Sequence, residues 1–265
     1  MNKQANGRGG RGIEWTNYTW NPVRGCQHGC RWVMPDGSIA ECYAETIAER
    51  LAQAAYPLGF EHHYWNPHVL EEPLKVKEPV RIFLDSMSDL MGHWVPRDEI
   101  LQVLDVCERA SWHTFQLLTK NAPRLAEFEF PDNVWTGVSA PPSMMFGRTL
   151  SALQQRRMVE RQLRVLNTLD VAVRWMSIEP LSFDIAPLLV GANLQWVVIG
   201  AATNGRAVYQ PEREWVQNVL DVCDDQGVAV FFKGNLDWSP WREAFPDDAA
   251  KREKLHGWVK DAAVI

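Results

Sequence analysis

Segments with the composition of β-strands alternate with segments of helical periodicity along most of the chain. Alternation of this kind favours parallel strands joined by helical crossovers, and a strand roughly every thirty residues suits a barrel better than a small open sheet. We therefore predict an α/β fold, a partial or closed (β/α) barrel with about six to seven parallel strands. The predicted strands are residues 18–24, 80–85, 114–118, 133–138, 173–178, 195–200 and 228–232.

The segments between these strands place apolar residues at helical spacing. A weak internal echo, Leu-Asp-Val-Cys, ends two of them. We read the echo as one helix-then-strand unit used twice, and we expect its cysteines, Cys107 and Cys223, to be buried helix residues. The predicted helices are residues 45–55, 96–110, 121–128, 150–169 and 212–226.

Polar residues follow the carboxyl ends of the predicted strands, where barrels carry their chemistry. Lys120, Glu179 and Lys233 are charged residues just past apolar strands, and they are candidate catalytic residues. A cap or turn position suits Ser139 better, because serine favours such positions. The other polar strand ends are residues 85–89, 201–205 and Asn235.

Three of the five cysteines, Cys26, Cys30 and Cys42, lie within one short stretch. Eleven residues separate the second from the third, but they contain a strong turn signal, Pro35-Asp36-Gly37-Ser38. If the segments on either side of this turn pair as a hairpin, Cys30 falls opposite Cys42 or Tyr43. Directly opposed residues have Cβ atoms about 5 Å apart, so we expect three sulfur atoms to face one point.

Three thiolates can hold an iron–sulfur cluster, which usually has four cysteine ligands, so that one iron is left open for a substrate or cofactor. A structural zinc is the second interpretation, with His28 completing a tetrahedral set of three cysteines and one histidine. The third is that these are unrelated free cysteines. The close spacing beside Gly25, Gly29 and Gly37 makes this the weakest of the three, because it is not a core-packing pattern.

The composition, 46% hydrophobic and 23% charged over 265 residues, is typical of a globular chain long enough for one large domain. No run of eighteen apolar residues occurs, and the polar, Gly-rich N-terminus does not have the apolar core of a signal peptide. An odd number of cysteines without a secretion signal favours a reducing cytoplasm. The net charge of −6 disfavours a general nucleic-acid coat protein, although it is compatible with a local basic patch.

Changes in composition divide the chain into three predicted parts. Residues 1–12 form a flexible Arg/Gly tail, which either binds nucleic acid or has no measurable function. Residues 13–235 form the barrel. Residues 236–265 contain a predicted amphipathic helix at 248–262, and we expect this helical extension to pack on the barrel.

Short motifs in a fixed order connect the chain to a known family. They are Ile13-Glu-Trp-Thr, Trp20-Asn-Pro-Val-Arg-Gly-Cys26, Cys42-Tyr-Ala-Glu, Asp85-Ser-Met-Ser-Asp-Leu90, His113-Thr-Phe-Gln-Leu-Leu-Thr-Lys120, Asn133-Val-Trp-Thr-Gly-Val-Ser139, Ser177-Ile-Glu-Pro-Leu181 and Phe231-Phe-Lys233. In this order they resemble the phage and prophage three-cysteine-motif proteins, a radical-SAM-like family. The run from Asn21 to Cys30 is also similar to the cluster loop of spore photoproduct lyase and its relatives, which act on DNA bases.

The resemblance implies a barrel of the radical-SAM type with a 4Fe–4S cluster on Cys26, Cys30 and Cys42. The open iron would bind S-adenosylmethionine. One electron from an external reductant would then cleave it to methionine and a 5′-deoxyadenosyl radical, which abstracts hydrogen from the substrate. The resemblance therefore implies a radical SAM enzyme that modifies a nucleobase or nucleotide in a phage context. It implies no membrane partner and a location in the cytoplasm of the host cell.

The same resemblance assigns individual residues. Those implied to hold S-adenosylmethionine are Asp85, Ser86, Glu179 and the aromatic residue after the third cysteine, Tyr43. The two lysines that follow strands, Lys120 and Lys233, are implied to meet an anionic substrate.

The alternative function is a non-catalytic phage protein whose cysteines hold structural zinc or an inert cluster, and which acts through a protein or nucleic-acid partner. The chain also departs from its relatives in two places. One is the long insertion between Cys30 and Cys42. The other is Gly200-Ala-Ala-Thr-Asn-Gly205, which replaces a Gly-Gly-Glu-Ser-Gly run. Because the acidic residue of that run is missing, we expect the choice of substrate to differ.

Overall fold

The structure, a computed structural model, describes residues 1–4 and 12–246. Its centre is an eight-stranded sheet. In sheet order the strands are β1 (Asn2–Lys3), β2 (Tyr18–Trp20), β7 (Arg81–Leu84), β8 (Thr114–Thr119), β9 (Val134–Ser139), β12 (Arg174–Ile178), β13 (Trp196–Ile199) and β16 (Ala229–Phe232). From β2 to β16 every neighbouring pair is parallel, and β1 is antiparallel to β2. Six of the seven predicted strands are therefore confirmed, and the seventh, predicted at 18–24, is confirmed in its first part.

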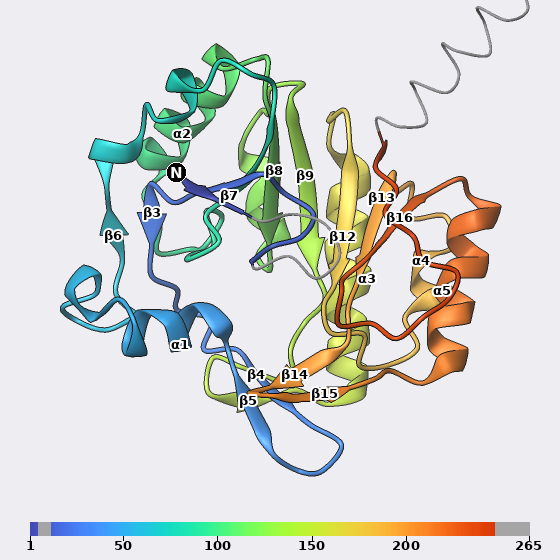
Figure 1. The fold of residues 1–265 in the computed structure, drawn as a ribbon. Coiled ribbons are helices and arrows are strands. Elements are labelled where there is room, and N and C mark those ends of the chain that lie inside the picture. Colours follow the sequence, from blue (N-terminus) through green and yellow to red (C-terminus); the bar gives the residue numbers. More distant parts are fainter. Residues whose placement is uncertain (5–11, 247–265) are drawn as a thin grey trace, which may run out of the picture.

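The strands cross the molecule in sequence order, as Figure 1 shows from β7 to β16. In the described part of the chain, the edge strands β1 and β16 do not pair with each other. The α/β class and the parallel sheet are confirmed, whereas a ring of strands closed by hydrogen bonds is not seen there.

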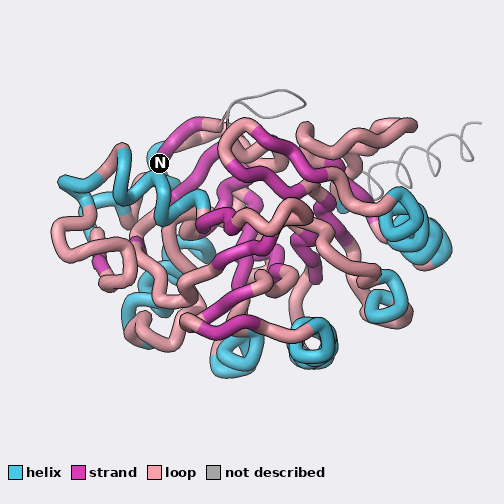
Figure 2. The backbone as a smooth tube through the Cα atoms, turned by 90° about the horizontal axis from the view of Figure 1, so that it is seen from below, coloured by secondary structure: helices cyan, strands magenta, loops and turns pink. Residues whose placement is uncertain are grey.

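The helices lie around the outer side of this row of strands (Figure 2). They are α1 (Tyr43–Arg50), α2 (Arg97–Arg109), α3 (Ala152–Thr168), α4 (Ala186–Leu189) and α5 (Arg213–Asp225). The start of α3 is fixed by a capping box, in which Ser151 and Gln154 each bond the other's backbone N–H. Short 3₁₀ turns are η1 (Gln53–Ala55), η2 (Pro67–Val69), η3 (Pro73–Lys75) and η4 (Ala122–Glu127). The predicted helix at 121–128 is thus a 3₁₀ turn, and the one at 45–55 ends early at Arg50.

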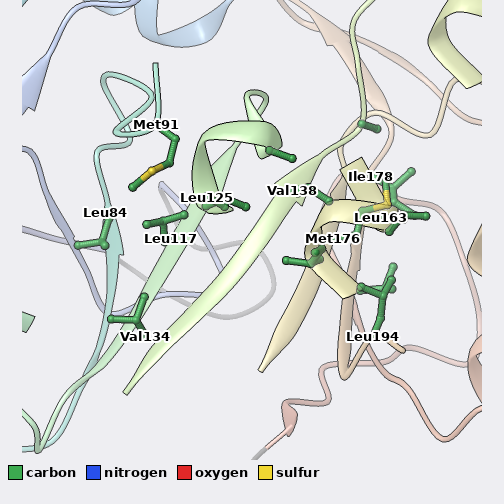
Figure 3. Close-up of a cluster of buried hydrophobic side chains, with 14 of the residues drawn as sticks. Leu84, Met91, Leu117, Leu125, Val134, Val138, Leu163, Met176, Ile178 and Leu194 are labelled. Carbon is green, nitrogen blue, oxygen red and sulfur yellow. The ribbon is translucent and has the colours of Figure 1, made fainter. Parts of the chain in front are cut away.

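Alternate residues of each strand face opposite sides of the sheet. One set faces the helices and forms the main core, in which Val134 and Met176 of the sheet lie in one cluster with Leu125 and Leu163 (Figure 3). Cys107 and Cys223, on α2 and α5, belong to this core, as predicted. No described helix is both long enough and apolar enough to cross a membrane.

The other set of strand residues forms a second, aromatic cluster on the inner side of the sheet. Its members are Trp15, Phe83, Trp135, Trp175, Trp196, Val198 and Phe231. The rings meet mostly edge to face, as for Trp15 and Trp175, whose ring centroids are 5.3 Å apart. A Cβ on Gly137 would lie 2.4 Å from the Trp175 ring, so the packing requires glycine at that position. We call this set the inner tryptophan cluster.

Smaller sheets, separate from the central one, are formed by the remaining strands. They pair β4 (Arg31–Val33) with β5 (Ile39–Glu41), β10 (Met144–Met145) with β4 and β11 (Arg148–Thr149), β14 (Ala202–Asn204) with β15 (Ala207–Tyr209), and β3 (Val23–Arg24) with β6 (Tyr64–Trp65). The strand predicted at 18–24 is divided between β2 and β3, because Pro22 has no N–H to continue a ladder. The two- and three-residue strands β1, β6, β10, β11, β14 and β15 were not predicted.

The predicted C-terminal extension is described only in part. Trp238 and Trp241 pack against the main core, and Phe245 packs against the inner tryptophan cluster. The predicted Arg/Gly tail, apart from its ends, and the predicted helix at 248–262 lie outside the described residues.

A buried histidine before β8 predicts a pH dependence of stability. His113 Nδ1 accepts the Val80 N–H at 3.3 Å and Nε2 donates to the Pro73 carbonyl at 3.0 Å, a pairing that suits the neutral ring. Burial lowers the pKa of His113. The unfolded chain therefore binds a proton at higher pH than the folded chain. The free energy of unfolding should fall as the pH drops below about 6.5, toward the folded pKa.

Urea unfolding at about pH 7.5 and about pH 5.5 measures this effect. The loss of stability between the two pH values should be smaller in His113→Gln than in the wild type. Equal losses in the two proteins would contradict the assignment to His113.

Candidate active site at the carboxyl ends of the strands

A cavity of about 770 Å³ lies where the parallel strands end. Trp15 and Phe83 of the inner tryptophan cluster line it, together with polar residues that follow the strands. Polar residues follow the tryptophans on the same face because side chains alternate along a strand. Ser139 follows Trp135 in this way, and Ser177 and Glu179 follow Trp175. Six of the residues predicted for the site line this one cavity: Cys42, Tyr43, Ser86, Lys120, Glu179 and Lys233.

Glu179 and Lys233, which follow β12 and β16, form an ion pair across β13. Lys233 Nζ lies 3.3 Å from Glu179 Oε2, and Ser177 Oγ donates to Glu179 Oε1 at 3.0 Å. A Cβ on Gly200 would lie 3.2 Å from Glu179 Cγ and 3.3 Å from Lys233 Cδ. A glycine at this position therefore leaves space for the two side chains to pass over the strand between them. The structure thus joins two predicted catalytic residues into one unit of opposite charges.

The predicted hairpin between the second and third cysteines is confirmed. Arg31 pairs with Glu41 and Val33 with Ile39, so one step beyond the paired residues Cys30 stands opposite Cys42. The hairpin is tied to α1 by the Arg31 guanidinium, whose Nη2 donates to Glu45 Oε1 at 2.9 Å.

The tip of this hairpin contacts the β14–β15 hairpin, which contains the segment that departs from the family pattern. Tyr209 donates to Asp36 Oδ2 at 2.6 Å, and Asn204 Nδ2 donates to Ser38 Oγ at 3.1 Å. Figure 1 shows these strands side by side below the central sheet. Trp32 of the hairpin lines the cavity, so the insertion between the cysteines forms part of its wall.

The three thiols lie close enough to affect one another's charge. The pKa of Cys30 is raised to about 11, mainly by burial and also by the neighbouring Cys42, although Lys120 acts to lower it. Burial also raises the pKa of Cys26 well above its ordinary value, to which Asp89, Cys30 and Cys42 add. Deprotonation of these buried thiols is unfavourable on its own, but it becomes favourable when a metal offsets the negative charge of the thiolates. The three cysteines therefore suit a cationic metal cluster.

No three His, Cys, Asp or Glu side chains in residues 1–4 and 12–246 are close enough to share a single metal ion. The thiolates of a cluster bind different iron atoms and stand further apart than ligands of one ion. The absence of such a group among the described residues therefore concerns a single-ion site and does not decide whether the cysteines hold a cluster.

His28, the fourth zinc ligand of the alternative interpretation, has another partner. Its Nε2 lies 2.7 Å from Asp89 Oδ2, and both side chains are buried. The same carboxylate accepts the Lys120 N–H at 2.9 Å. Burial alone would raise the pKa of Asp89, but these bonds outweigh it and lower the pKa. Asp89 thus links the cysteine loop to the end of β8. His28 Nδ1 is buried without a hydrogen-bond partner, so the bond from Nε2 to Asp89 does not exclude His28 as a metal ligand.

The residues predicted to hold S-adenosylmethionine divide into two groups. Ser86 and Tyr43 both line the cavity, and the Tyr43 hydroxyl donates to the Ser86 carbonyl at 2.7 Å. Asp85 is only 2% exposed, does not line the cavity, and accepts the Val23 N–H at 3.1 Å. Because Val23 lies just before the cysteine loop, this hydrogen bond indicates that Asp85 holds the backbone of the loop in place.

The sequence analysis missed several lining residues, of which three stand close to the cysteine motif or contact it. Asn21 accepts from the Ser86 hydroxyl at 3.1 Å and the Met87 N–H at 2.9 Å. Asn21 comes directly after β2, but the strand predicted at 18–24 included it, so the rule that polar residues follow strands did not identify it. Arg24 and Tyr56 also line the cavity. Arg24 lies within the cysteine motif itself, whereas nothing in the sequence singles out Tyr56.

The fold is similar to that of spore photoproduct lyase. A Cys-to-Ser variant of spore photoproduct lyase matches at a TM-score of 0.52 and 11% identity, covering 84% of this chain and 80% of that one. The lyase complexed with dinucleoside spore photoproduct gives a TM-score of 0.48 at 11% identity, over 82% and 77%. SuiB of Streptococcus suis gives 0.40 at 10% identity, over 83% of this chain and 49% of SuiB.

Residues 10–263 match the family described as "Protein of unknown function (DUF5131)", and the chain belongs to that family. A comparison with curated proteins gives no match.

Proposed function

We propose that this chain is a radical SAM enzyme that holds a 4Fe–4S cluster on Cys26, Cys30 and Cys42 and acts on a nucleobase or nucleotide. The observation that carries the proposal is the hairpin register, which sets Cys30 opposite Cys42 beside a cavity, in a fold similar to that of spore photoproduct lyase. The nucleobase or nucleotide substrate and the phage context rest on the motif resemblance.

When bound, the cluster and S-adenosylmethionine supply one-electron cleavage of a sulfonium and abstraction of a hydrogen atom, with the electron coming from an external reductant. The chain's own contribution is to hold and shield the ligands. Trp15, Phe83 and Leu118 form an apolar base that excludes water from the cavity.

The polar wall of the cavity suits the two charged ends of an amino acid. Glu179 is the carboxylate available to an ammonium group, and Ser86 offers a hydroxyl to a carboxylate or ribose. Tyr43 presents a ring beside the third cysteine for contact with adenine. Lys120 and Lys233 remain the candidates for holding an anionic substrate.

Anaerobic purification and reconstitution test the proposal. Iron and sulfide should be present, with absorbance near about 400 nm, and the dithionite-reduced protein should form 5′-deoxyadenosine from S-adenosylmethionine. A colourless, zinc-loaded protein would favour the alternative, a non-catalytic metal-binding phage protein acting through a protein or nucleic-acid partner.

Glu179→Gln should weaken the binding of S-adenosylmethionine about tenfold to a hundredfold, because a charged hydrogen bond contributes about 1.5–3 kcal/mol. Equilibrium binding to the reconstituted protein measures this change. Glu160→Gln, on the exposed side of α3, is the matched control and should bind as the wild type does. Unchanged affinity in Glu179→Gln would show that this carboxylate does not hold the ligand.

A further inference from the structure

Arg24 lines the cavity on the wall formed by β3, η1 and η2. Its guanidinium lies over the Tyr56 ring, 5.7 Å from the ring centroid. Its Nε is buried and has no hydrogen-bond partner. A buried donor without a partner is costly, so an unpartnered guanidinium at a cavity wall calls for an explanation.

The other charged residues of the cavity have partners or neighbours that account for their charge. Lys233 pairs with Glu179. Burial alone would lower the pKa of Lys120, but the neighbouring Cys30, Cys42 and Asp89 outweigh it and raise the pKa. Glu72, the acid on the Arg24 wall, pairs with the amino group of Met1. Within residues 1–4 and 12–246, the Arg24 guanidinium thus lines the cavity with neither a carboxylate nor a hydrogen-bond acceptor as its partner.

A planar guanidinium held against an aromatic ring is suited to an oxyanion, which it binds through two parallel N–H groups. Asn21 and Asn66 add amide groups to the same wall. This wall belongs to the β2 end of the sheet, whereas Glu179 and Lys233 belong to the β12–β16 end. Small-molecule sites occupy about 300–1,000 Å³, and the cavity of about 770 Å³ lies in the upper half of this range.

We propose that Arg24 is an oxyanion-binding residue of this cavity, in addition to the candidates Lys120 and Lys233, and that it takes the phosphate group of a nucleotide. The inference rests on the proposed function, which it deepens by naming a chemical group of the substrate and the residue that selects it. The carboxylate of S-adenosylmethionine offers the same chemistry, and the two sources are separated by experiment.

The test compares each of the four deoxynucleoside monophosphates with its own nucleoside, by calorimetric titration of the full-length protein. The tightest pair should favour the phosphate-bearing ligand at least about tenfold. Arg24→Gln should remove this preference by weakening nucleotide binding about tenfold to a hundredfold while leaving nucleoside binding unchanged. Arg24→Lys should retain part of the preference, because it keeps the charge but not the fork. Arg164→Gln, an exposed position on α3, is the control.

The possible results of this titration separate the phosphate assignment from its alternatives. No preference for phosphate in the wild type, no measurable binding, or a preference that survives in Arg24→Gln would overturn the phosphate assignment. If Arg24→Gln instead weakens S-adenosylmethionine in the reconstituted protein, the oxyanion is the cofactor's carboxylate. Thermal unfolding of both Arg24 variants checks that they are folded. Formation of 5′-deoxyadenosine without any nucleotide is measured separately, so a failure of the radical chemistry does not imitate a failure of Arg24.

Discussion

Cys42→Ala is expected to abolish the formation of 5′-deoxyadenosine and to lower the iron and sulfide content of the reconstituted protein. With two thiolates left, the cluster would lose one of its three protein ligands. Even an outer-shell partner of a metal typically contributes tenfold to a hundredfold in affinity or activity, so removal of a direct ligand should exceed about a hundredfold. Product analysis by chromatography, together with iron and sulfide assays, measures both effects.

The effect of Cys42→Ala can be assigned to the thiol because the Cys42 side chain contributes little else to the structure. It is the residue before α1, and its side chain makes no capping hydrogen bond. Alanine there should leave the helix and the hairpin intact. Cys223→Ala is the control, since Cys223 is buried in the main core on α5 and should not change iron content. Unchanged turnover in Cys42→Ala would show that the third ligand has been wrongly assigned.

The hairpin that presents Cys42 was predictable because all its signals are local. A Pro-Asp-Gly-Ser turn fixes where the chain reverses, and the register then follows by counting from residue to residue. The parallel strands were predictable for the same reason, since each is a short apolar run between helices. Barrel closure was not, because it depends on whether the distant edge strands β1 and β16 meet.

Contacts between strands distant in sequence set the limits of the prediction at the site. Lys233 and Glu179 were each identified as charged residues after a strand, but their pairing depends on the neighbours of β13 in the sheet. Asp85 occupies the expected loop, yet its backbone adopts a positive φ of 52° and its carboxylate accepts from Val23 beneath the cysteine loop. Side-chain direction in such a loop follows from the tertiary structure.

Gly25→Ala is expected to disrupt the cysteine loop far more than an ordinary glycine substitution. Gly25 has a φ of +86°, and a Cβ there would lie 1.8 Å from the His62 carbonyl oxygen. Its own N–H donates to Met87 and its carbonyl accepts from Ser88, so the residue is held on both sides. The left-handed backbone costs about 1–2 kcal/mol for alanine, and overpacking adds about 1–3 kcal/mol.

The combined loss of about 2–5 kcal/mol should appear as a lower urea midpoint and, because Cys26 is the next residue, as a lower iron content. Gly29→Ala is the matched control. Gly29 lies in the same loop at a φ of +58°, but nothing lies within 4 Å of a Cβ built there. It should therefore lose only the backbone cost of about 1–2 kcal/mol and keep its iron. If the two variants lost equal stability and equal iron, the close approach of residue 62 would not be what fixes the position of Cys26.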